Sequence, residues 1–301
     1  MLIENFRCLR HVEMKLEPLT VLVGANASGK SSVFAALAQD YRPEDRWARQ
    51  VDLVVRTIAR AREPGNLVTF ELRMEITGAR IGSLPECQLL QLDLDHLRQS
   101  NQLQETRLLG ARGSGLANLF ATLTRREQDE IAKQLCALVP MFNDVAARPQ
   151  GSGTHRIVFQ DAWQPDIWYE PWQVSDGTML MFAFLLLPYQ TPAPDLIAIE
   201  EPERGLHPFL MSELVQALRK LATGQLGPKP VQVLLATHSA ELLEFVEPTE
   251  VRFFRRSKDT GETIVEHAPV DDPSWLTTLR EYDDSLGDVW LSGGLGGVPG
   301  S

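Results

Sequence analysis

The stretch Gly24-Ala25-Asn26-Ala27-Ser28-Gly29-Lys30-Ser31 matches the phosphate-loop pattern G-x-x-x-x-G-K-[ST]. An apolar run, Leu19 to Val23, precedes it, and a segment with helical character, Ser32 to Ala38, follows it. Glycines let the backbone fold around an anion, and the N–H groups of such a loop, together with the N-terminus of the next helix, bind phosphate oxygens. This strand–loop–helix context predicts a nucleoside triphosphate site in an α/β fold.

The lysine and the last serine of the loop have separate predicted tasks. The Lys30 ammonium is expected to contact the β- and γ-phosphates, and the Ser31 hydroxyl is expected to hold Mg²⁺. The predicted nucleotide-binding residues of this segment are Gly24, Asn26, Ala27, Ser28, Gly29, Lys30, Ser31 and Ser32.

The composition is that of an ordinary soluble globular protein, with 44% hydrophobic and 23% charged residues in a chain of 301. No apolar run reaches the length of a membrane span, and the N-terminus lacks a signal-peptide pattern. The three cysteines, Cys8, Cys87 and Cys136, are widely spaced, which favours reduced thiols over a disulfide framework or a zinc site. We therefore expect a cytoplasmic protein without membrane contact.

The net charge of −11 argues against a protein that coats nucleic acid, because such proteins usually carry a basic surface. Two arginine clusters, Arg56-Arg60-Arg62 and Arg252-Arg255-Arg256, leave a local DNA-binding groove open as an alternative. A solvated face is the commoner explanation of such a cluster.

Between the phosphate loop and residue 150 the pattern indicates a compact α+β insertion, residues 41–150. Its end is marked by a linker-like patch, Pro149 to Gly153. The predicted elements up to that patch are strands at Val12–Leu16, 67–76 and 90–94, a helix at Val51–Ala61, and a helix that opens on the capping box Thr124–Glu127 and ends near residue 139.

After the patch the pattern becomes α/β, so we assign residues 1–40 and 151–270 to one discontinuous core. A C-terminal segment, residues 271–301, ends in a glycine-rich tail that is not expected to order by itself. The predicted elements are buried strands at Leu196–Ile199 and Val231–Ala236, helices opening at Pro208 and at Ala240, and strands at 251–254 and 263–266.

The predicted buried strand Leu196–Ile199 is followed directly by two carboxylates, Glu200 and Glu201. They lie at its carboxyl end, where parallel sheets bind ligands. We assign Glu200 to Mg²⁺, through water, and Glu201 to the water molecule that attacks the γ-phosphate. The strand that ends at Ala236 leads into Thr237-His238-Ser239, and His238 is a candidate to contact the γ-phosphate and help hold that water.

Ser175-Asp176-Gly177-Thr178 opens a strongly apolar helix that runs from Met179 to Leu187. Ser175 is a simple N-cap in one interpretation. In the other, the serine hydroxyl and the glycine N–H at a helix N-terminus form an anion receptor.

The order of these motifs, phosphate loop, S-D-G-T, I-x-I-E-E-P-E and T-H-S, resembles that of ABC-type ATPases. The details resemble the SMC/RecF/OLD-like branch, as the opening strand Ile3–Arg10 and the segment Glu201–Pro208 show. The resemblance covers about residues 1–40 and 170–256 and implies the fold of an ABC-ATPase head, a mixed sheet flanked by helices.

The resemblance also implies roles for the site residues. Lys30 and Ser31 become phosphate- and magnesium-binding residues of an ATP site, Glu201 the catalytic carboxylate and His238 the switch residue. Ser175-Asp176-Gly177 becomes the signature that contacts ATP held by the opposite protomer, which implies a head-to-tail homodimer with ATP at the interface.

Two departures from the family pattern stand out. The usual magnesium-side aspartate is Glu200 here, and no clear Q-loop glutamine is present, although Gln88, Gln91 and Gln160 are candidates. Because sustained heptads are absent, we expect no coiled-coil arm, and we expect no full fused nuclease domain after Pro248.

These features give a leading hypothesis, an ATPase switch for a separately encoded effector, such as a nuclease, in DNA repair or anti-phage defence. The alternatives are a RecF-type repair ATPase that binds DNA directly and, with less support from the signature sequence, the ATPase subunit of a membrane transporter.

Overall fold

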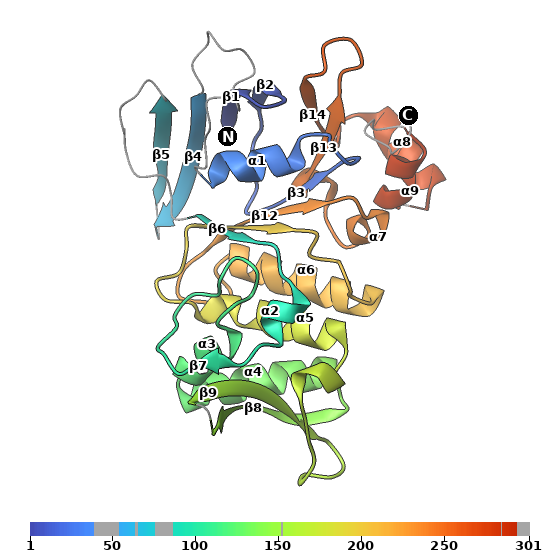
Figure 1. The fold of residues 1–301 in the computed structure, drawn as a ribbon. Coiled ribbons are helices and arrows are strands. Elements are labelled where there is room, and N and C mark those ends of the chain that lie inside the picture. The colour runs from blue at the N-terminus through green and yellow to red at the C-terminus, as the bar shows by residue number, and fades with distance from the viewer. Residues whose placement is uncertain (39–53, 64–65, 76–86, 152, 284, 294–301) are drawn as a thin grey trace. The chain divides into compact units, whose positions relative to one another are not determined.

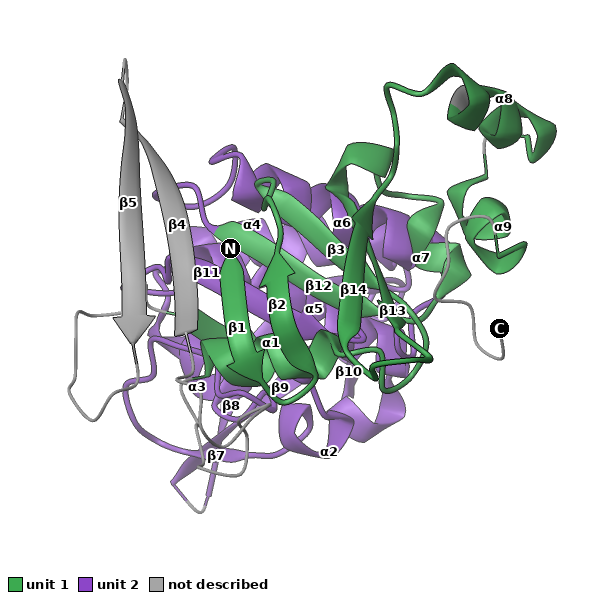
Figure 2. Cartoon of the chain, turned by 90° about the horizontal axis from the view of Figure 1, so that it is seen from above, with its two compact units in different colours: residues 1–89, 232–301 green, residues 90–231 purple. Residues whose placement is uncertain are grey.

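The computed structural model describes residues 1–38, 54–63, 66–75, 87–151, 153–283 and 285–293. The chain divides into two compact units: residues 1–89 with 232–301 form unit 1, and residues 90–231 form unit 2 (Figure 2). Unit 1 is thus built from both ends of the sequence and unit 2 from its middle. These divisions fall at other residues than the predicted borders of core, insertion and C-terminal segment, which stay a prediction.

Unit 1 contains an antiparallel sheet with the strand order β2-β1-β4-β5. Its strands are β1 (Leu2–Phe6), β2 (Leu9–Glu13), β4 (Val54–Glu63) and β5 (Asn66–Glu75). The helix predicted at Val51–Ala61 is therefore wrong over its described part. The apolar residues of that segment fit both the period of a helix and the alternation of a strand. Its β-branched residues favour the strand once β1 and β5 supply backbone partners. The strand predicted at 67–76 is confirmed over its described residues.

The second sheet of unit 1 carries the phosphate loop. β3 (Leu19–Val23) lies between β12 (Gln232–Thr237) and β13 (Val251–Arg256) and is parallel to both, and β14 (Thr263–His267) pairs antiparallel with β13. All five residues of β3 are buried, as expected for a strand with neighbours on both sides. The helix α1 (Lys30–Leu37) follows β3, so the predicted mixed sheet of a P-loop α/β fold is confirmed (Figure 1).

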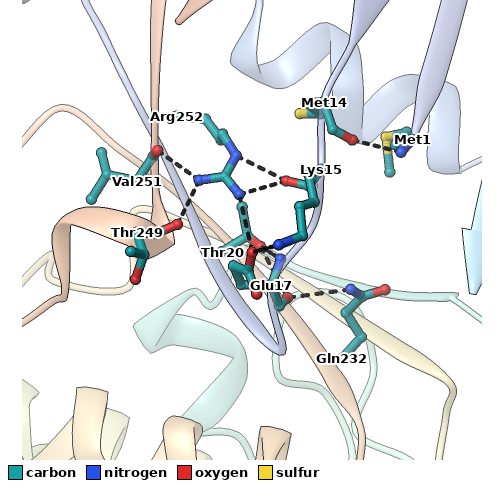
Figure 3. A network of polar contacts seen from close by, with 9 residues as sticks. All are labelled: Met1, Met14, Lys15, Glu17, Thr20, Gln232, Thr249, Val251 and Arg252. Atoms are coloured by element: carbon teal, nitrogen blue, oxygen red, sulfur yellow. Dashed lines mark hydrogen bonds and ion pairs between the residues drawn. The ribbon is translucent and has the colours of Figure 1, made fainter. Parts of the chain in front are cut away.

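Arg252 of β13 is buried, with only 1% of its surface exposed, and its guanidinium group is surrounded by carbonyl oxygens (Figure 3). Its Nε and Nη2 donate to Lys15 O at 2.8 and 2.6 Å, and its Nη1 donates to Thr249 O and Val251 O, both at 2.8 Å. Burial lowers the pKa of Arg252. This side chain connects β13 to the segment that enters β3, and it forms neither a solvated face nor a DNA groove.

Unit 1 also contains short helices that follow β12 along the chain. They are α7 (Ala240–Leu243), the 3₁₀ turn η4 (Pro248–Glu250), α8 (Pro273–Glu281) and α9 (Leu286–Leu291). α9 packs on α7, and the carboxylate of Glu244 accepts hydrogen bonds from Gly287 N at 2.9 Å and Ser285 Oγ at 2.8 Å. The glycine-rich tail from residue 294 onward lies outside the described residues.

In unit 2, α3 and α4 pack on the hairpin of β8 and β9, and α5 packs on α4 and α6 (Figure 1). Phe182 of α5 is central to this core, since its ring lies 5.2 Å from that of Phe120 and 6.0 Å from that of Phe159. The helices are α2 (Leu94–Leu97), α3 (Leu116–Thr122), α4 (Arg125–Leu138), α5 (Asp176–Leu185) and α6 (Pro208–Ala222), with 3₁₀ turns η2 (Pro171–Gln173) and η3 (Leu187–Tyr189). The strands are β7 (Asn101–Gln102), β8 (Phe142–Gln150), β9 (Thr154–Asp161), β10 (Trp168–Tyr169) and β11 (Leu196–Glu200), and β6 (Cys87–Leu90) spans the border of the units.

Two local predictions in this region are wrong and one is confirmed. The patch predicted as a linker lies instead between two strands of a hairpin, because β8 ends at Gln150, β9 starts at Thr154 and these two residues pair. Only the first residue of the strand predicted at 90–94 is a strand residue, because Asp93 accepts a hydrogen bond from His96 N and caps α2 instead. The capping box that opens on Thr124 is present in full.

Candidate nucleotide site

The phosphate loop connects β3 to α1, and two of its residues have a left-handed backbone conformation. Ala27 has φ +62° and Gly29 has φ +113°, and Gly29 occupies the N-cap position of α1 without a capping side chain. A Cβ atom at Gly24 would overlap the carbonyl oxygen of Phe254, and one at Gly29 would overlap the Thr263 hydroxyl. Both positions of the motif therefore need glycine, which gives the loop the close backbone approach that a phosphate requires.

Lys30 turns back on its own loop. Its Nζ donates hydrogen bonds to Gly24 O, to Ala25 O at 2.9 Å and to Ser28 Oγ at 3.4 Å. The positive charge thus lies beside the backbone groups that the motif assigns to phosphate. Asn26, Ala27 and Ser31 are exposed, Ser28 is buried, and Ser32 is half-buried with Cys8 Sγ 3.5 Å from its hydroxyl.

His238 reaches the same edge of the sheet as the phosphate loop. In the parallel pair of β12 and β3, Thr237 is in register with Val23, so His238 and Gly24 are each the next residue after a matched pair. His238 is exposed, while Thr237 Oγ1 accepts from Ser239 N at 2.9 Å. Ser239 in turn caps α7, so the turn that carries the histidine is fixed on both sides. Within unit 1 the structure thus places the phosphate loop and His238 directly after neighbouring parallel strands.

The predicted magnesium-side carboxylate, Glu200, and the predicted catalytic carboxylate, Glu201, lie in unit 2, at the carboxyl end of β11. Four buried residues of this strand lead to half-buried Glu200, and Glu201 then adopts φ +48°. A left-handed glutamate costs about 1–2 kcal/mol, and such strain gathers at functional sites. The turn is held by Arg204 N, which donates to Glu201 O at 3.1 Å, and the Arg204 guanidinium lies 3.9 Å from the Glu201 carboxylate.

The segment Ser175–Thr178, here called the signature segment, starts α5 in unit 2. Ser175 caps the helix, with its Oγ accepting from Thr178 N at 3.2 Å, and the side chains of Ser175 and Asp176 are exposed. Gly177 lies against the turn after Glu201, because a Cβ there would come within 3.4 Å of Gly205 O. The structure therefore places the signature segment beside the E-P-E-R-G-L-H-P segment within one unit.

Sequence reasoning missed Arg98, whose hydrogen bonds hold the backbone that leads into the signature segment. Its Nη2 donates to Asp176 Oδ1 at 2.7 Å and to Val174 O at 3.2 Å, and its Nε donates to Pro171 O at 3.1 Å. No motif surrounds Arg98 in the sequence, so only the fold reveals this contact.

The residues of unit 1 fit a nucleotide and its metal. A triphosphate needs close approach to the loop backbone, which the two glycine positions that exclude a Cβ allow, and a positive charge, which the Lys30 ammonium supplies. Mg²⁺ needs a hydroxyl ligand, and the Ser31 hydroxyl is exposed. Among the described residues no group of three His, Cys, Asp or Glu side chains is placed to hold a metal ion, and no helix is long and apolar enough to cross a membrane.

Comparisons with known proteins bear on the family and the fold of the chain. The family described as "AAA domain, putative AbiEii toxin, Type IV TA system" matches residues 124–244, and the family described as "AAA ATPase domain" matches residues 1–45. The SMC head domain from Thermotoga maritima is similar in structure, with a TM-score of 0.55 at 15% identity over 88% of this chain and 97% of that one. The fold is that of an SMC/ABC-like P-loop ATPase.

Two further SMC heads show the same likeness. One, an SMC head bound to the C-terminal winged-helix domain of ScpA, gives a TM-score of 0.62 at 13% identity over 90% of this chain and 97% of that chain. The other, an Smc head with an extended coiled coil bound to the C-terminal domain of ScpA derived from Pyrococcus furiosus, gives 0.58 at 10% identity over 94% and 98%. No curated protein matches the chain in sequence. At these identities the likeness concerns the fold of the ATPase head.

Proposed function

We propose that the chain binds ATP with Mg²⁺ and hydrolyses it. The observation that carries this proposal is the phosphate loop itself, with two glycine positions closed to any Cβ and Lys30 Nζ against the loop backbone. The SMC/ABC-like fold and the AAA family matches support it. In this proposal Glu200 and Glu201 have the metal and catalytic roles that the sequence pattern assigns to them.

The proposed reaction is in-line attack of water on the γ-phosphorus of ATP. Glu201 accepts the proton of the attacking water, His238 helps to hold that water, and the bond from the γ-phosphorus to the bridging oxygen of ADP breaks. Lys30 and the loop N–H groups stabilise the charge that develops on the phosphate oxygens. Ser31 and, through water, Glu200 would hold Mg²⁺, which would supply further charge neutralisation.

We further propose that ATP joins two copies of the chain. The exposed Ser175 hydroxyl and the N-terminus of the ten-residue helix α5 are suited to bind the γ-phosphate of ATP held by a second protomer. Hydrolysis then releases the pair, which makes ATP a switch. The effector is a separately encoded protein, such as a nuclease, acting in the cytoplasm in DNA repair or anti-phage defence. Solved SMC heads bound to ScpA are a precedent for a head that binds a partner protein.

The structure lends less support to direct DNA binding by the 252–256 cluster. Arg252 is buried among carbonyl oxygens, and Arg255 donates to Glu266 at 2.9 Å. The side chains of the other cluster, Arg56-Arg60-Arg62, lie outside the described residues.

The experiment that tests the proposal is ATP binding by the Lys30→Ala variant, measured by calorimetry with Mg²⁺. We expect the affinity to fall at least 100-fold, because the loop loses its phosphate-facing charge. Lys229→Ala, which removes an exposed pair with Asp195, is the matched control and should bind like the wild type. Equal affinities of all three proteins would refute the assignment of the phosphate loop.

The catalytic and dimer parts are tested with Glu201→Gln. This variant should bind ATP normally, hydrolyse it at least 100-fold more slowly and accumulate as a dimer in light scattering with ATP. Glu213→Gln on α6 is the control for removal of a carboxylate. Turnover at the wild-type rate in Glu201→Gln would assign the general base to another residue, and a monomer with bound ATP would overturn the dimer.

A further inference from the structure

We propose that Thr263 is a positioning residue of the phosphate loop, and that its hydroxyl turns the Gly29 N–H towards the β-phosphate of a bound nucleotide. This inference rests on the proposed nucleotide binding and assigns a role to a residue that no motif marks.

The first step is a buried hydrogen bond between distant parts of the chain. Thr263 Oγ1 donates to Ser28 O at 2.9 Å, although the two residues lie 235 positions apart in the sequence. Thr263 is 3% exposed and Ser28 is 2% exposed, so water does not compete for this carbonyl. The bond therefore fixes the direction in which the Ser28 carbonyl points, which is into the protein.

The second step follows from the geometry of the peptide unit. The Ser28 carbonyl and the Gly29 N–H belong to one planar trans peptide, in which the C=O and N–H bonds point in opposite directions. With the oxygen bonded to the buried Thr263 hydroxyl, the Gly29 N–H points away from the interior. Gly29 is also the N-cap of α1, where the backbone N–H groups of the phosphate-loop motif bind the nucleotide.

The third step concerns how firmly Thr263 itself is held. Its backbone N donates to Cys8 O at 2.8 Å, in the turn between β1 and β2, and it pairs with Arg256 in the β13–β14 ladder. On its other side it fills the space that a side chain at Gly29 would need. Main-chain bonds on β14 therefore position the hydroxyl independently of the loop that it supports.

The proposed role requires the hydroxyl group of Thr263 and no other part of its side chain. Valine has nearly the same shape but cannot donate, so Thr263→Val leaves the Ser28 carbonyl without its hydrogen bond and lets the 28–29 peptide rotate. Serine keeps the donor. The chain also offers a matched control at the other end of β3: buried Thr20 donates from Oγ1 to Glu17 O at 3.0 Å, away from the loop.

The experiment measures ADP affinity by calorimetry, and the ³¹P chemical shift of the β-phosphate of bound ADP, in the wild type, Thr263→Val, Thr263→Ser and Thr20→Val. We expect Thr263→Val to bind ADP about 10-fold more weakly and to shift the β-phosphate signal, because a correctly directed N–H is lost. Thr263→Ser should restore both values to within about 2-fold of the wild type. Thr20→Val should lower the stability but change neither nucleotide readout.

The outcomes separate this inference from the function on which it rests. Wild-type ADP binding together with unchanged affinity and ³¹P shift in Thr263→Val would overturn the role of Thr263 and leave nucleotide binding intact. An equal loss in Thr20→Val would also overturn it, because the effect would then come from stability alone. A wild-type chain that binds no nucleotide would overturn both.

Discussion

The phosphate loop and the signature segment are both helix N-termini with predicted phosphate contacts, yet they are built differently. The loop has left-handed residues at Ala27 and Gly29, and its N-cap supplies no side-chain bond. Its shape depends on Phe254 and Thr263, which lie more than 220 residues further along the chain. The signature segment instead starts on Ser175, in the extended region, with its cap bond made to Thr178 three residues later.

This difference decides what a substitution does in each region. In the loop the backbone is held against other strands, so an added atom meets main chain that cannot move without disturbing the sheet. In the signature segment the helix start is specified locally, and its neighbours on α6 are side chains that can adjust. We therefore expect stability and nucleotide chemistry to be coupled in the loop and separable in the signature segment.

The largest effect is expected for Gly24→Ala. The new Cβ would overlap Phe254 O on the neighbouring strand β13, which costs about 2–3 kcal/mol of unfolding free energy as overpacking against backbone. Urea denaturation measures it. Gly151→Ala is the control, since a Cβ there meets nothing within 4 Å, and it should change stability by less than about 0.5 kcal/mol. A Gly24→Ala protein as stable as the wild type would show that the loop is not held by β13.

A smaller effect is expected for Ser175→Ala, which removes the cap of α5. Loss of an N-cap costs about 1 kcal/mol, and an asparagine at the same position keeps the cap. Ser175→Asn should therefore recover stability in urea denaturation while ATP-dependent dimer formation, measured by light scattering, stays impaired, because the hydroxyl is gone. If both variants lose stability and dimerisation to the same extent, the two properties are coupled here as well, and the comparison with the loop fails.

How far the sequence predicted this site depends on how local each feature is. The phosphate-loop motif can be recognised from its own eight residues, although distant strands hold its shape. The cap at Ser175, the capping box at Thr124 and the helix start at Pro208 are each specified within a few residues, and the structure has all three. Buried strands such as β11 and β12 were also predictable, because their apolar runs are short enough to favour a strand over a buried helix.

The failures are features that only tertiary partners decide. The segment 54–63 pairs with β1 and β5 as a strand, although its apolar spacing suits a helix. β8 and β9 pair along their length as a hairpin, and the glycine content of the segment between them does not distinguish a hairpin connection from a linker. Arg98, Arg252 and Thr263 act through carbonyl groups of distant segments, and hydrogen bonds to backbone carbonyls leave no pattern in the sequence.

The smallest effect is expected for Gly177→Ala, where two contributions oppose each other. Alanine gains up to about 1 kcal/mol over glycine inside a helix. Against this, its Cβ would lie 3.1 Å from Leu210 Cδ1, the end of a side chain that can move, and 3.4 Å from Gly205 O, which is close to ordinary contact. The net change in unfolding free energy should therefore stay within about 1 kcal/mol.

Gly205→Ala provides the contrast for Gly177→Ala, because Gly205 has φ +82° and an alanine there must pay about 1–2 kcal/mol for the left-handed backbone. Parallel urea denaturation of the two variants distinguishes backbone strain from side-chain crowding in the same small contact. A loss above about 2 kcal/mol in Gly177→Ala would mean that the signature segment, like the phosphate loop, is held by rigid tertiary contacts. A loss confined to Gly205→Ala would mean that in this contact the backbone conformation, and not the packing, demands glycine.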